Sequence, residues 1–471
     1  MDKSDFSMCI KAVTPLHFGS GDTYKQGFDF IGKNIINVNG IMQHMKQKPQ
    51  LLHEMAAAIN GNRLQEFISR NKKEIPDACF RPMNVEEEPR GDIRAHIKNG
   101  LGQAYIPGSA IKGSIRTAII KAMSSQDYLK KKVQGIMSAP RINVKFADSV
   151  ITNSLLSPHP RGDAKFNLMK ALRISDSDTI NGGLQIKKIQ IKNTSKGPLY
   201  VEVIPAGTIT SFTLDLDDFF LSPGNRDKLF GAVKYDFNNL PADLNEATVK
   251  TLSYHYRFAK RNNLHAYDFL TDILKSLKGN EALVNLGYGI GWVGMTGNLL
   301  GSYYNTLGDR EKLQLKSILR LNPTRHQQDY FPITRRFIKE GDREIPMGWA
   351  LITFPENFRK KEWNFSGIPD CADYIDDIKT GSKNSSAAMA SFSGGGLMIG
   401  QIYKAKIVAI NDERKFAEAV VGKTKGRIMI SEIANAYVTN MSDYIWEGKE
   451  VNVKVTEIRN GNYFFSIKKA Q

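Results

Sequence analysis

Cysteine is scarce in this chain of 471 residues, and several common motifs are missing. Cys9, Cys79 and Cys371 lie far apart and form no CxxC pair, which argues against a disulfide framework or a zinc finger and favours a reducing compartment. The eight histidines form no HExxH motif, and no run of about 18 apolar residues predicts a transmembrane helix. The first residues also lack a signal-peptide pattern. We therefore expect a cytoplasmic protein with no membrane association, no bound metal and no cofactor.

Acidic residues are fewer than basic ones. The sequence has 65 Lys and Arg against 48 Asp and Glu, which gives a formal net charge of +17. A surplus of this size favours a polyanionic partner, most often nucleic acid, although a generically basic protein has the same balance. The length exceeds what a single hydrophobic core usually serves, so we expect about two to four domains.

The tract at residues 105–117, YIPGSAIKGSIRT, combines a Pro-Gly-Ser turn with the start of a basic amphipathic helix. Its apolar residues recur at the spacing of one helix face, and Ser109 is placed to cap the first turn. Lys112 and Arg116 lie four residues apart and share another face. Backbone N–H groups at a helix N-terminus beside two cations favour phosphate binding, but an ordinary capped surface helix has the same pattern.

Glycine is dense at residues 284–301, VNLGYGIGWVGMTGNLLG. The tract contains a formal GxGxxG, but no second strand–helix unit follows, so a dinucleotide site is not favoured. We interpret Gly287, Gly289 and Gly291 as a loop that lets the backbone approach a polyanion closely. Trp292 is expected either to stack on a base or to pack in the core.

Two other short tracts carry candidate residues. Arg335 and Arg336 follow a proline-containing loop, and they are predicted either to clamp phosphates or to form a solvated basic turn. His17 precedes the glycine-rich run of Gly19, Ser20 and Gly21. A histidine there can serve acid–base cleavage of RNA, but it is more often a structural residue.

Between these tracts we predict short strands near the N-terminus and at 184–216, and helices at 49–71, 109–123 and 243–278. The charged stretch at 82–98 is expected to be irregular. Residues 380–396 are rich in Ser, Gly and Ala and lack periodicity, which predicts a flexible linker. After it, five short strands at regular spacing in 400–471 predict a small OB-type barrel.

Several of these tracts together resemble the RAMP (repeat-associated mysterious protein) superfamily of CRISPR proteins. IPGSAIKGSIRTAI resembles its helix-opening signature, and GYGIGWVGMTG resembles its glycine-rich loop. Four further tracts, TPLHFGSGD, ALRISDSD, YVEVIPAGT and FPITRRF followed by PMGWALI, resemble more narrowly the fifth-subunit family of the type III-A Csm effector complex. Their order along residues 6–355 also fits.

This resemblance implies an α+β fold with tandem RRM-like (ferredoxin-like) RAMP domains. The expected organisation is a first domain at 1–215 with a helical insertion, a second at 216–379 with the glycine-rich loop, the linker at 380–396 and the OB-type module at 397–471. It also implies a non-catalytic subunit that caps the 3′ end of the guide RNA (crRNA) and supports crRNA maturation. The implied partners are crRNA, target RNA, the other subunits of the effector, notably the repeated backbone subunit, and a host nuclease.

The module at 397–471 resembles the S-one-type OB domain of ribosomal and RNA-decay proteins. Phe416 falls where that family often places a base-stacking aromatic, whereas Met429 stands where the family commonly has a histidine. The module is expected to bind RNA or to dock another protein. The RNA-contact candidates of the whole chain are His17, Gly19, Ser20, Gly21, Gly108, Ser109, Lys112, Arg116, Arg173, Gly287, Gly289, Gly291, Trp292, Arg335, Arg336, Tyr403, Phe416, Lys425 and Arg427.

Two other functions remain open on the sequence. A guide-processing endoribonuclease of the RAMP superfamily would need a catalytic residue such as His17. A general RNA-binding adaptor would use the barrel to recruit a nuclease. Because no acid–base or metal-binding constellation stands out, we expect no catalytic residues in this chain.

Overall fold

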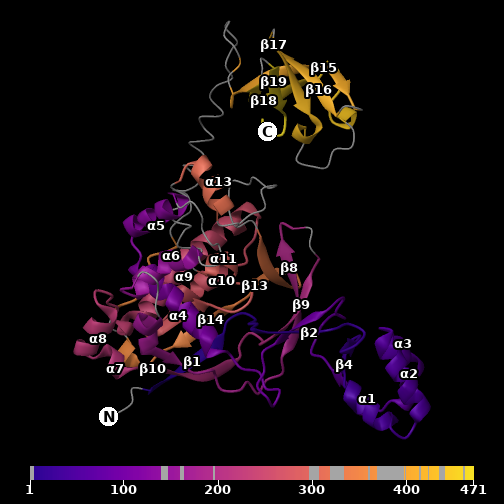
Figure 1. Cartoon of the computed structure of the whole chain (residues 1–471), viewed down its shortest axis with the longest axis vertical. Helices are drawn as coiled ribbons and strands as arrows, with labels where there is room; N and C mark the ends of the chain where they lie inside the picture. Colours follow the sequence, from indigo (N-terminus) through magenta and orange to yellow (C-terminus); the bar gives the residue numbers. More distant parts are fainter. Residues whose placement is uncertain are drawn as a thin grey trace. The chain divides into compact units, whose positions relative to one another are not determined.

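The computed structural model describes residues 5–138, 147–159, 164–194, 197–295, 307–318, 334–358, 361–368, 397, 399–412, 415–422, 424–433, 441–459 and 462–470. The predicted linker at 380–396 lies outside these residues. The chain forms two compact units, Met1–Cys371 and Ala372–Gln471, and each is considered by itself (Figure 1). The expected α+β fold with a C-terminal OB-type barrel is confirmed.

The first unit is built on a five-stranded antiparallel sheet. The order of its strands is β11 (Glu281–Asn285), β14 (Trp349–Thr353), β1 (Asp5–Ala12), β10 (Ile209–Leu216) and β7 (Leu172–Ile174). In β1, Met8, Ile10 and Ala12 are buried while Cys9 and Lys11 are exposed. This alternation buries one face of β1 and exposes the other, whereas Leu283 of β11 and Trp349 of β14 are buried on that second face of the sheet in a separate cluster.

Two long helices contribute to the core on the buried face. They are α4 (Gly108–Met123) and α9 (Leu240–Arg261), which pack against each other and contact β7 and β11, respectively (Figure 1). The predicted apolar stripe of α4 is confirmed, because Ile111, Ile115 and Ile119 are fully buried. Together with the inward side chains of β1, these residues form the main hydrophobic core.

The chain order β1–α4–β7–β10–α9–β14, with the spatial order β14–β1–β10–β7, is the ferredoxin-like arrangement. Strand β11 adds a further edge strand beside β14. This arrangement runs across the boundary predicted at residues 215 and 216, because β1, β7 and β10 come from the first predicted domain and β14 from the second. The two segments therefore share one hydrogen-bonded sheet.

A second, six-stranded sheet also takes strands from both segments. Its order is β13 (Arg343–Pro346), β12 (Arg335–Glu340), β8 (Gln185–Lys192), β9 (Leu199–Val203), β6 (Ile93–His96) and β2 (Gly19–Tyr24). Strand β6 lies in the stretch 82–98 that was expected to be irregular, so that expectation is wrong for residues 93–96. Residues alternate between the two sides of β6, so Ile93 and Ala95 are buried and Arg94 is exposed. The many charged residues around this short alternating pattern hid it in the sequence.

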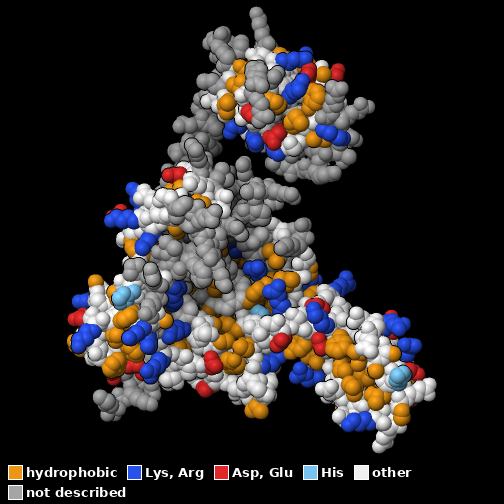
Figure 2. Space-filling model, viewed as in Figure 1, with side chains coloured by type: hydrophobic (Ala, Val, Ile, Leu, Met, Phe, Trp, Pro, Cys, Tyr) orange, Lys and Arg blue, Asp and Glu red, His pale blue; other side chains and the backbone are white. Residues whose placement is uncertain are grey.

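Between β2 and β6 the chain inserts a small helical module with a core of its own. Its elements are β3 (Phe30–Ile31), β4 (Asn34–Ile36), α1 (Val38–Met45), α2 (Pro49–Asn60), α3 (Leu64–Arg70) and β5 (Phe80–Pro82). Figure 1 shows its helices set to one side of the two sheets, and Figure 2 shows hydrophobic side chains gathered on its visible face. Helices α2 and α3 fall within residues 49–71, where the sequence predicts helices.

The remaining helices of the first unit are shorter. They are α5 (Gln126–Ser138), α6 (Ala147–Leu156), α7 (Asp218–Leu221), α8 (Pro223–Phe230), α10 (Asp268–Ser276), α11 (Gly291–Gly294) and α13 (Asp309–Ile318). Among the residues that the structure describes, no helix combines the length and the apolar character that a membrane span needs.

The second unit is a closed five-stranded barrel. Its strands are β15 (Ile402–Asn411), β16 (Phe416–Val421), β17 (Thr424–Met429), β19 (Asn462–Ser466) and β18 (Glu450–Arg459) in spatial order. Alternate residues point inward, as in β15, where Tyr403, Ala405 and Ile407 are buried. Gly426 lies so close to the Phe465 ring that any side chain at that position would collide with it.

Candidate nucleic-acid interface

Three loops that are far apart in the sequence are hydrogen-bonded together in the first unit. The Tyr288 N–H donates to the His17 carbonyl over 2.8 Å, and the Leu286 N–H donates to the Gly348 carbonyl over 2.7 Å. The Gly348 N–H in turn donates to the Pro15 carbonyl over 3.2 Å. The loop after β1, the glycine-rich loop after β11 and the turn before β14 therefore form one surface.

Two of the predicted glycines are required by this packing. Gly287 has φ of 81°, and a Cβ there would lie 2.8 Å from the His17 carbonyl oxygen. Gly289 has φ of 102°, and its Cβ would lie 2.8 Å from the Cβ of Met347. Gly291 has φ of 59° but faces open space. The first two allow close approach within the protein, and Gly291 leaves its backbone accessible.

Tyr288 lies between two arginines. The guanidinium of Arg94 is 5.2 Å from the centre of the Tyr288 ring, and that of Arg336 is 5.1 Å from it. Arg94 comes from β6 and Arg336 from β12, and two strands separate them, roughly 14 Å across the sheet. The two guanidiniums therefore reach the ring from strands on either side of β8 and β9. The His17 ring packs nearly perpendicular to the Tyr288 ring, with the two ring centres 5.5 Å apart.

We call this arrangement the loop site: His17 to Gly21, Arg94, Gly287 to Gly294, and Arg336. Sequence reasoning missed Arg94 and Tyr288. The alternating pattern around Arg94 could have predicted an exposed residue in a strand. Nothing in the sequence predicts that Arg94 contacts a tyrosine in a loop that leaves another sheet. A ring with two cations on it holds two positive charges at a fixed spacing, an arrangement that suits neighbouring phosphates.

His17 and His96 are buried beneath the loop site and stabilise it through hydrogen bonds. The His17 Nδ1–H donates to the Glu202 carbonyl over 2.6 Å, and His17 is 2% exposed. His96 accepts at Nδ1 from the Phe18 N–H, 3.3 Å away, and donates from Nε2 to the Tyr105 carbonyl, 3.2 Å away. Burial lowers the pKa of both imidazoles, that of His96 to about 4. His17 is therefore a buried, hydrogen-bonded structural residue, whose position does not suit acid–base attack on RNA.

A buried ion pair lies beside these histidines. The Lys98 ammonium donates to both carboxylate oxygens of Glu202, at 2.8 and 2.7 Å, and to the Tyr24 hydroxyl at 2.8 Å. Burial alone would lower the pKa of Lys98, but the hydrogen bonds to Glu202 and Tyr24 outweigh it and raise the pKa. Glu202 also accepts from the His96 N–H. This satisfied network fixes β6 against β9 and so fixes Arg94.

Within the loop site, Gly19, Ser20 and Gly21 form the exposed start of β2. The Ser20 hydroxyl lies 3.5 Å from the Ala95 carbonyl, to which it donates, and the Asp22 N–H donates to the Ser20 hydroxyl oxygen over 3.1 Å. Gly21 has φ of 95° and faces open space. These exposed backbone groups are accessible to a ligand.

The barrel has its own aromatic and basic surface on the outward face of β16 and β17. The guanidinium of Arg427 lies 5.0 Å from the centre of the half-buried Phe416 ring. Phe416 pairs with Met429, which is 41% exposed, and Arg427 lies beside Phe464 of β19. Outward residues of three neighbouring strands thus combine two aromatic rings with a cation, as in single-strand binding surfaces.

Two of the residues predicted for the barrel surface are placed differently. Tyr403 is 9% exposed and belongs to the barrel core, because it occupies an inward position of β15. Its expected RNA contact is therefore corrected. Lys425 is exposed but forms an ion pair with Glu418 across the β16–β17 pair at 2.5 Å, which partly neutralises it.

Comparison with known families matches two parts of the chain. The model of the RAMP superfamily matches residues 9–294, and that of the S1 RNA binding domain matches residues 397–468. The first match covers more than half of the chain. This protein belongs to the RAMP superfamily. Its barrel is a C-terminal S1-type domain, and we call the first unit the RAMP unit.

Individual relatives are more distant. The chain is 23% identical over 391 residues to "CRISPR system Cms protein Csm5" of Methanocaldococcus jannaschii, which covers 73% of this chain and 88% of that protein. A chain of the cryo-EM structure of a Csm–crRNA–target RNA ternary complex from a type III-A CRISPR-Cas system aligns with a TM-score of 0.52 at 19% identity, over 74% of this chain and all of that one. The crystal structure of T. onnurineus Csm5 aligns with a TM-score of 0.50 at 20% identity, over 73% and 99%. These structures share the fold of the RAMP unit.

The start of α4 in the RAMP unit differs from the predicted phosphate site. The helix begins at Gly108, whose N–H donates to the Asp176 carboxylate over 2.8 Å. Ser109 is exposed in the first turn and does not cap it, so the predicted cap is wrong. Lys112 donates to the Leu172 carbonyl over 2.6 Å, and Arg116 donates to the Thr152 hydroxyl over 3.0 Å. A carboxylate already occupies the position expected for phosphate.

The two consecutive arginines of the RAMP unit lie on opposite faces of β12, because successive residues of a strand alternate. Arg336 belongs to the loop site. Arg335 is 8% exposed, and its Nε donates to His255 Nδ1 over 3.1 Å while its guanidinium lies 4.9 Å from the centre of the Phe258 ring. The expectation that both arginines clamp the same phosphates is therefore corrected.

Two further candidates have partners within the RAMP unit. Arg173 is exposed on β7, where its guanidinium pairs with Asp217 and, at 3.4 Å, with Asp215. Trp292 is half-buried and packs against the main core, which was one of its two expected roles. Within the described parts of the chain, no three His, Cys, Asp or Glu side chains come together as a group that could hold a metal ion.

Proposed function

We propose that this RAMP protein is a non-catalytic subunit of a type III-A CRISPR effector, which binds crRNA and caps its 3′ end. The observation that carries the proposal is the loop site, where two arginines held by Tyr288 lie beside exposed glycine backbone. Cations and backbone N–H groups bind phosphates without reading bases. A guide-holding subunit needs that property, since the guide sequence varies.

The relatives support the effector role. The M. jannaschii relative is named as a Csm5 protein, and one structural neighbour is part of a complex with crRNA and target RNA. We propose that the partners of this chain are likewise crRNA, target RNA and the other subunits of such a complex, with the repeated backbone subunit beside it. The S1-type barrel would then hold single-stranded RNA near the guide's 3′ end and support its maturation by a separate nuclease.

A guide-processing endoribonuclease is less well supported by the geometry. His17, the expected acid–base residue, is buried and its ring is committed to the Glu202 carbonyl. The buried Lys98–Glu202 pair beside it is fully hydrogen-bonded and serves the packing of β6 and β9. These contacts give the two histidines a structural role in the loop site.

The proposal is tested by tagging the protein, expressing it with its neighbouring genes and a CRISPR array, and sequencing the RNA that co-purifies. We expect discrete short RNAs, each with a repeat-derived 5′ tag and a spacer. Arg336→Ala should reduce the RNA retained, whereas the exposed Lys228→Ala, on α8, should not. Heterogeneous cellular RNA in the wild-type sample would instead favour an RNA-binding adaptor, and retention unchanged by Arg336→Ala would remove the loop site from the RNA path.

A further inference from the structure

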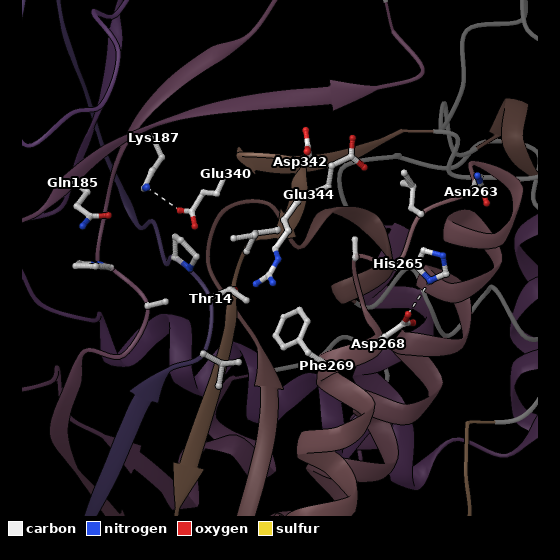
Figure 3. Close-up of a pocket in the computed structure, with 18 residues that line it drawn as sticks. Thr14, Gln185, Lys187, Asn263, His265, Asp268, Phe269, Glu340, Asp342 and Glu344 are labelled. Carbon is white, nitrogen blue, oxygen red and sulfur yellow. Dashed lines mark hydrogen bonds and ion pairs between the residues drawn. The ribbon is translucent and has the colours of Figure 1, made fainter.

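A large groove lies in the RAMP unit apart from the residues of the loop site. It has a volume of about 990 Å³ (Figure 3). Its walls are the β12–β13 hairpin, the start of β8, the loop after β1 and residues 263–269, which lead into α10. Part of the lining is apolar, including Val13, Leu264 and Ile345, and the Phe269 ring is 39% exposed. An aromatic ring left exposed beside a cavity of this size favours contact with a partner.

The charged residues of the groove are mostly acidic, although the chain as a whole is strongly basic. Asp268, Glu340, Asp342 and Glu344 line it, against Lys187 and Arg343. Figure 3 shows Lys187 directed toward Glu340 and His265 toward Asp268, with Asp342 at the same opening. These carboxylates come from the hairpin and from the start of α10, which lie far apart in the sequence.

The cations present leave part of this acidic charge unbalanced. Lys187 pairs with Glu340 at 2.8 Å and with Glu86 at 2.7 Å, so one cation faces two carboxylates. One carboxylate oxygen of Glu344 pairs with Lys192, while the other is buried without a hydrogen-bond partner among the described residues. Within the same described part of the chain, Asp342 has no ion-pair partner.

We propose that this acidic groove docks an extended basic segment of a neighbouring protein subunit, in which an apolar side chain is flanked by Lys or Arg. The apolar side chain would pack on Phe269 and Ile345, and the flanking cations would meet Asp342 and the partly exposed Glu340, which shares Lys187 with Glu86. RNA does not fit here, because its phosphates would face carboxylates instead of cations. The loop site and the acidic groove thus take partners of opposite charge.

Cross-linking within the assembled complex tests the groove directly. Phe269→p-benzoylphenylalanine keeps an aromatic ring at the groove and allows photo-cross-linking of the full chain, purified with its neighbouring gene products. We expect a cross-link to a Lys- or Arg-containing segment of another protein subunit, identified by mass spectrometry. A cross-link to RNA, to a segment without basic residues, or to no partner would overturn the proposal.

The proposal rests on the proposed function only in placing its partner in the same complex, and the same sample separates the two. Guide RNA that co-purifies while the basic cross-link is missing refutes the groove alone. A complex that retains no guide RNA refutes the proposed function, whatever position 269 contacts.

A binding measurement provides a second test, with a short synthetic peptide that alternates lysine with leucine as the probe. Asp342→Asn in the full chain removes one charge without changing the shape of the hairpin, and it should weaken peptide binding about threefold by fluorescence anisotropy. The matched control is Asp227→Asn, which removes an exposed charge on α8 outside the groove and should leave binding unchanged. Equal effects of the two substitutions, or displacement of the peptide by oligouridine, would contradict the docking of a basic segment.

Discussion

The loop site and the barrel surface both place guanidinium groups on an aromatic ring, but they build the contact differently. In the loop site, Arg94 and Arg336 approach Tyr288 from two strands of one sheet, and the tyrosine comes from a loop at the end of another. On the barrel, Arg427 and Phe416 come from two strands that pair directly. The first contact depends on tertiary packing, and the second on strand alternation.

This difference predicts different roles in RNA binding. Two guanidiniums and the His17 ring already contact Tyr288, so we expect the ring to orient cations toward phosphates and not to stack on a base. Phe416 carries one guanidinium, and Phe464 lies on the same outward surface, so base stacking remains compatible with the barrel. We therefore expect RNA binding at the loop site to depend mainly on ionic strength. RNA binding at the barrel surface should depend mainly on the aromatic rings of Phe416 and Phe464.

The largest expected effect follows from a substitution that breaks the packing of the loop site. In Gly287→Ala, the Cβ would collide with the His17 carbonyl and with the Phe18 ring, at a position with positive φ. We expect the free energy of unfolding of the RAMP unit to fall by about 4 kcal/mol in urea titration. Gly291→Ala meets open space and should cost only about 1 kcal/mol. Equal costs would show that the three loops do not pack as described.

Acidification should lower the stability of the RAMP unit more than that of the barrel. In the folded RAMP unit the pKa of His96 is about 4, below its ordinary value of 6.5, because of burial. As the pH falls from 6.5 to 4, the unfolded chain takes up a proton that the folded chain does not, so stability falls by on the order of 3 kcal/mol. Burial lowers the pKa of His17 and His255 as well, and both act in the same direction. Residues 397–471 contain no histidine, so the barrel lacks this contribution. The lowered pKa values of Glu418 and Glu450 make the barrel lose stability only as the pH nears the ordinary value of 4.5 for a glutamate.

This pH dependence is measurable by urea unfolding of the full chain carrying Trp446→Phe. Trp446 is the sole tryptophan of residues 397–471, so the remaining fluorescence comes from tryptophans outside the barrel. His96→Gln should reduce the dependence of stability on pH between 6.5 and 4. An unchanged dependence in that variant would mean that His96 is not held neutral by the fold.

Arg335 and Arg336 are adjacent in one strand but should differ in their effects on stability and on RNA binding. Arg335→Ala should lower the free energy of unfolding by about 2 kcal/mol, because it leaves His255 without its donor and removes the contact with Phe258. Arg336→Ala should cost about 1 kcal/mol of stability or less, yet weaken RNA binding and lower the slope of log affinity against log salt by about one. Similar effects of both variants on RNA binding would refute their placement on opposite faces.

The smallest effect is expected on the barrel. Phe416→Ala should weaken binding of the full chain to oligouridine by about 1 kcal/mol, with the salt dependence unchanged, because a stacking surface is lost without a charge. Tyr403→Ala would instead unfold the barrel, since Tyr403 is part of its core. If Phe416→Ala changes the salt slope but not the affinity at low salt, the surface does not act by stacking.

The parts of this structure that follow from local patterns were predictable from the sequence. The buried stripe of α4 repeats at helical spacing, and the barrel strands alternate between buried and exposed residues. The burial of Tyr403 was not predicted, because the sequence indicated a strand at β15 but not which of its faces points into the barrel. It also treated Arg335 and Arg336 as one group, because the strand that separates them by face was not placed at that position.

The loop site was only partly predictable, since long-range packing assembles it. The glycines were recognisable because positive φ and close backbone approach demand that residue. Arg94 and Tyr288 were not, because no periodicity connects a strand of one sheet with a loop that leaves the other. The carboxylate of Asp176 at the start of α4 is a contact of the same kind, between segments distant in sequence.

The pairing of Cys9 in β1 with Thr353 in β14 has a consequence for how the chain is made. The strand synthesised first cannot complete its place in the sheet until one of the last strands of the RAMP unit has left the ribosome. At about 5–20 residues per second, that delay is on the order of tens of seconds. During this time one edge of β1 lacks its strand partner and is open to pairing with other chains. The barrel, whose paired residues lie at most about 50 apart in the sequence, can close soon after its last strand emerges.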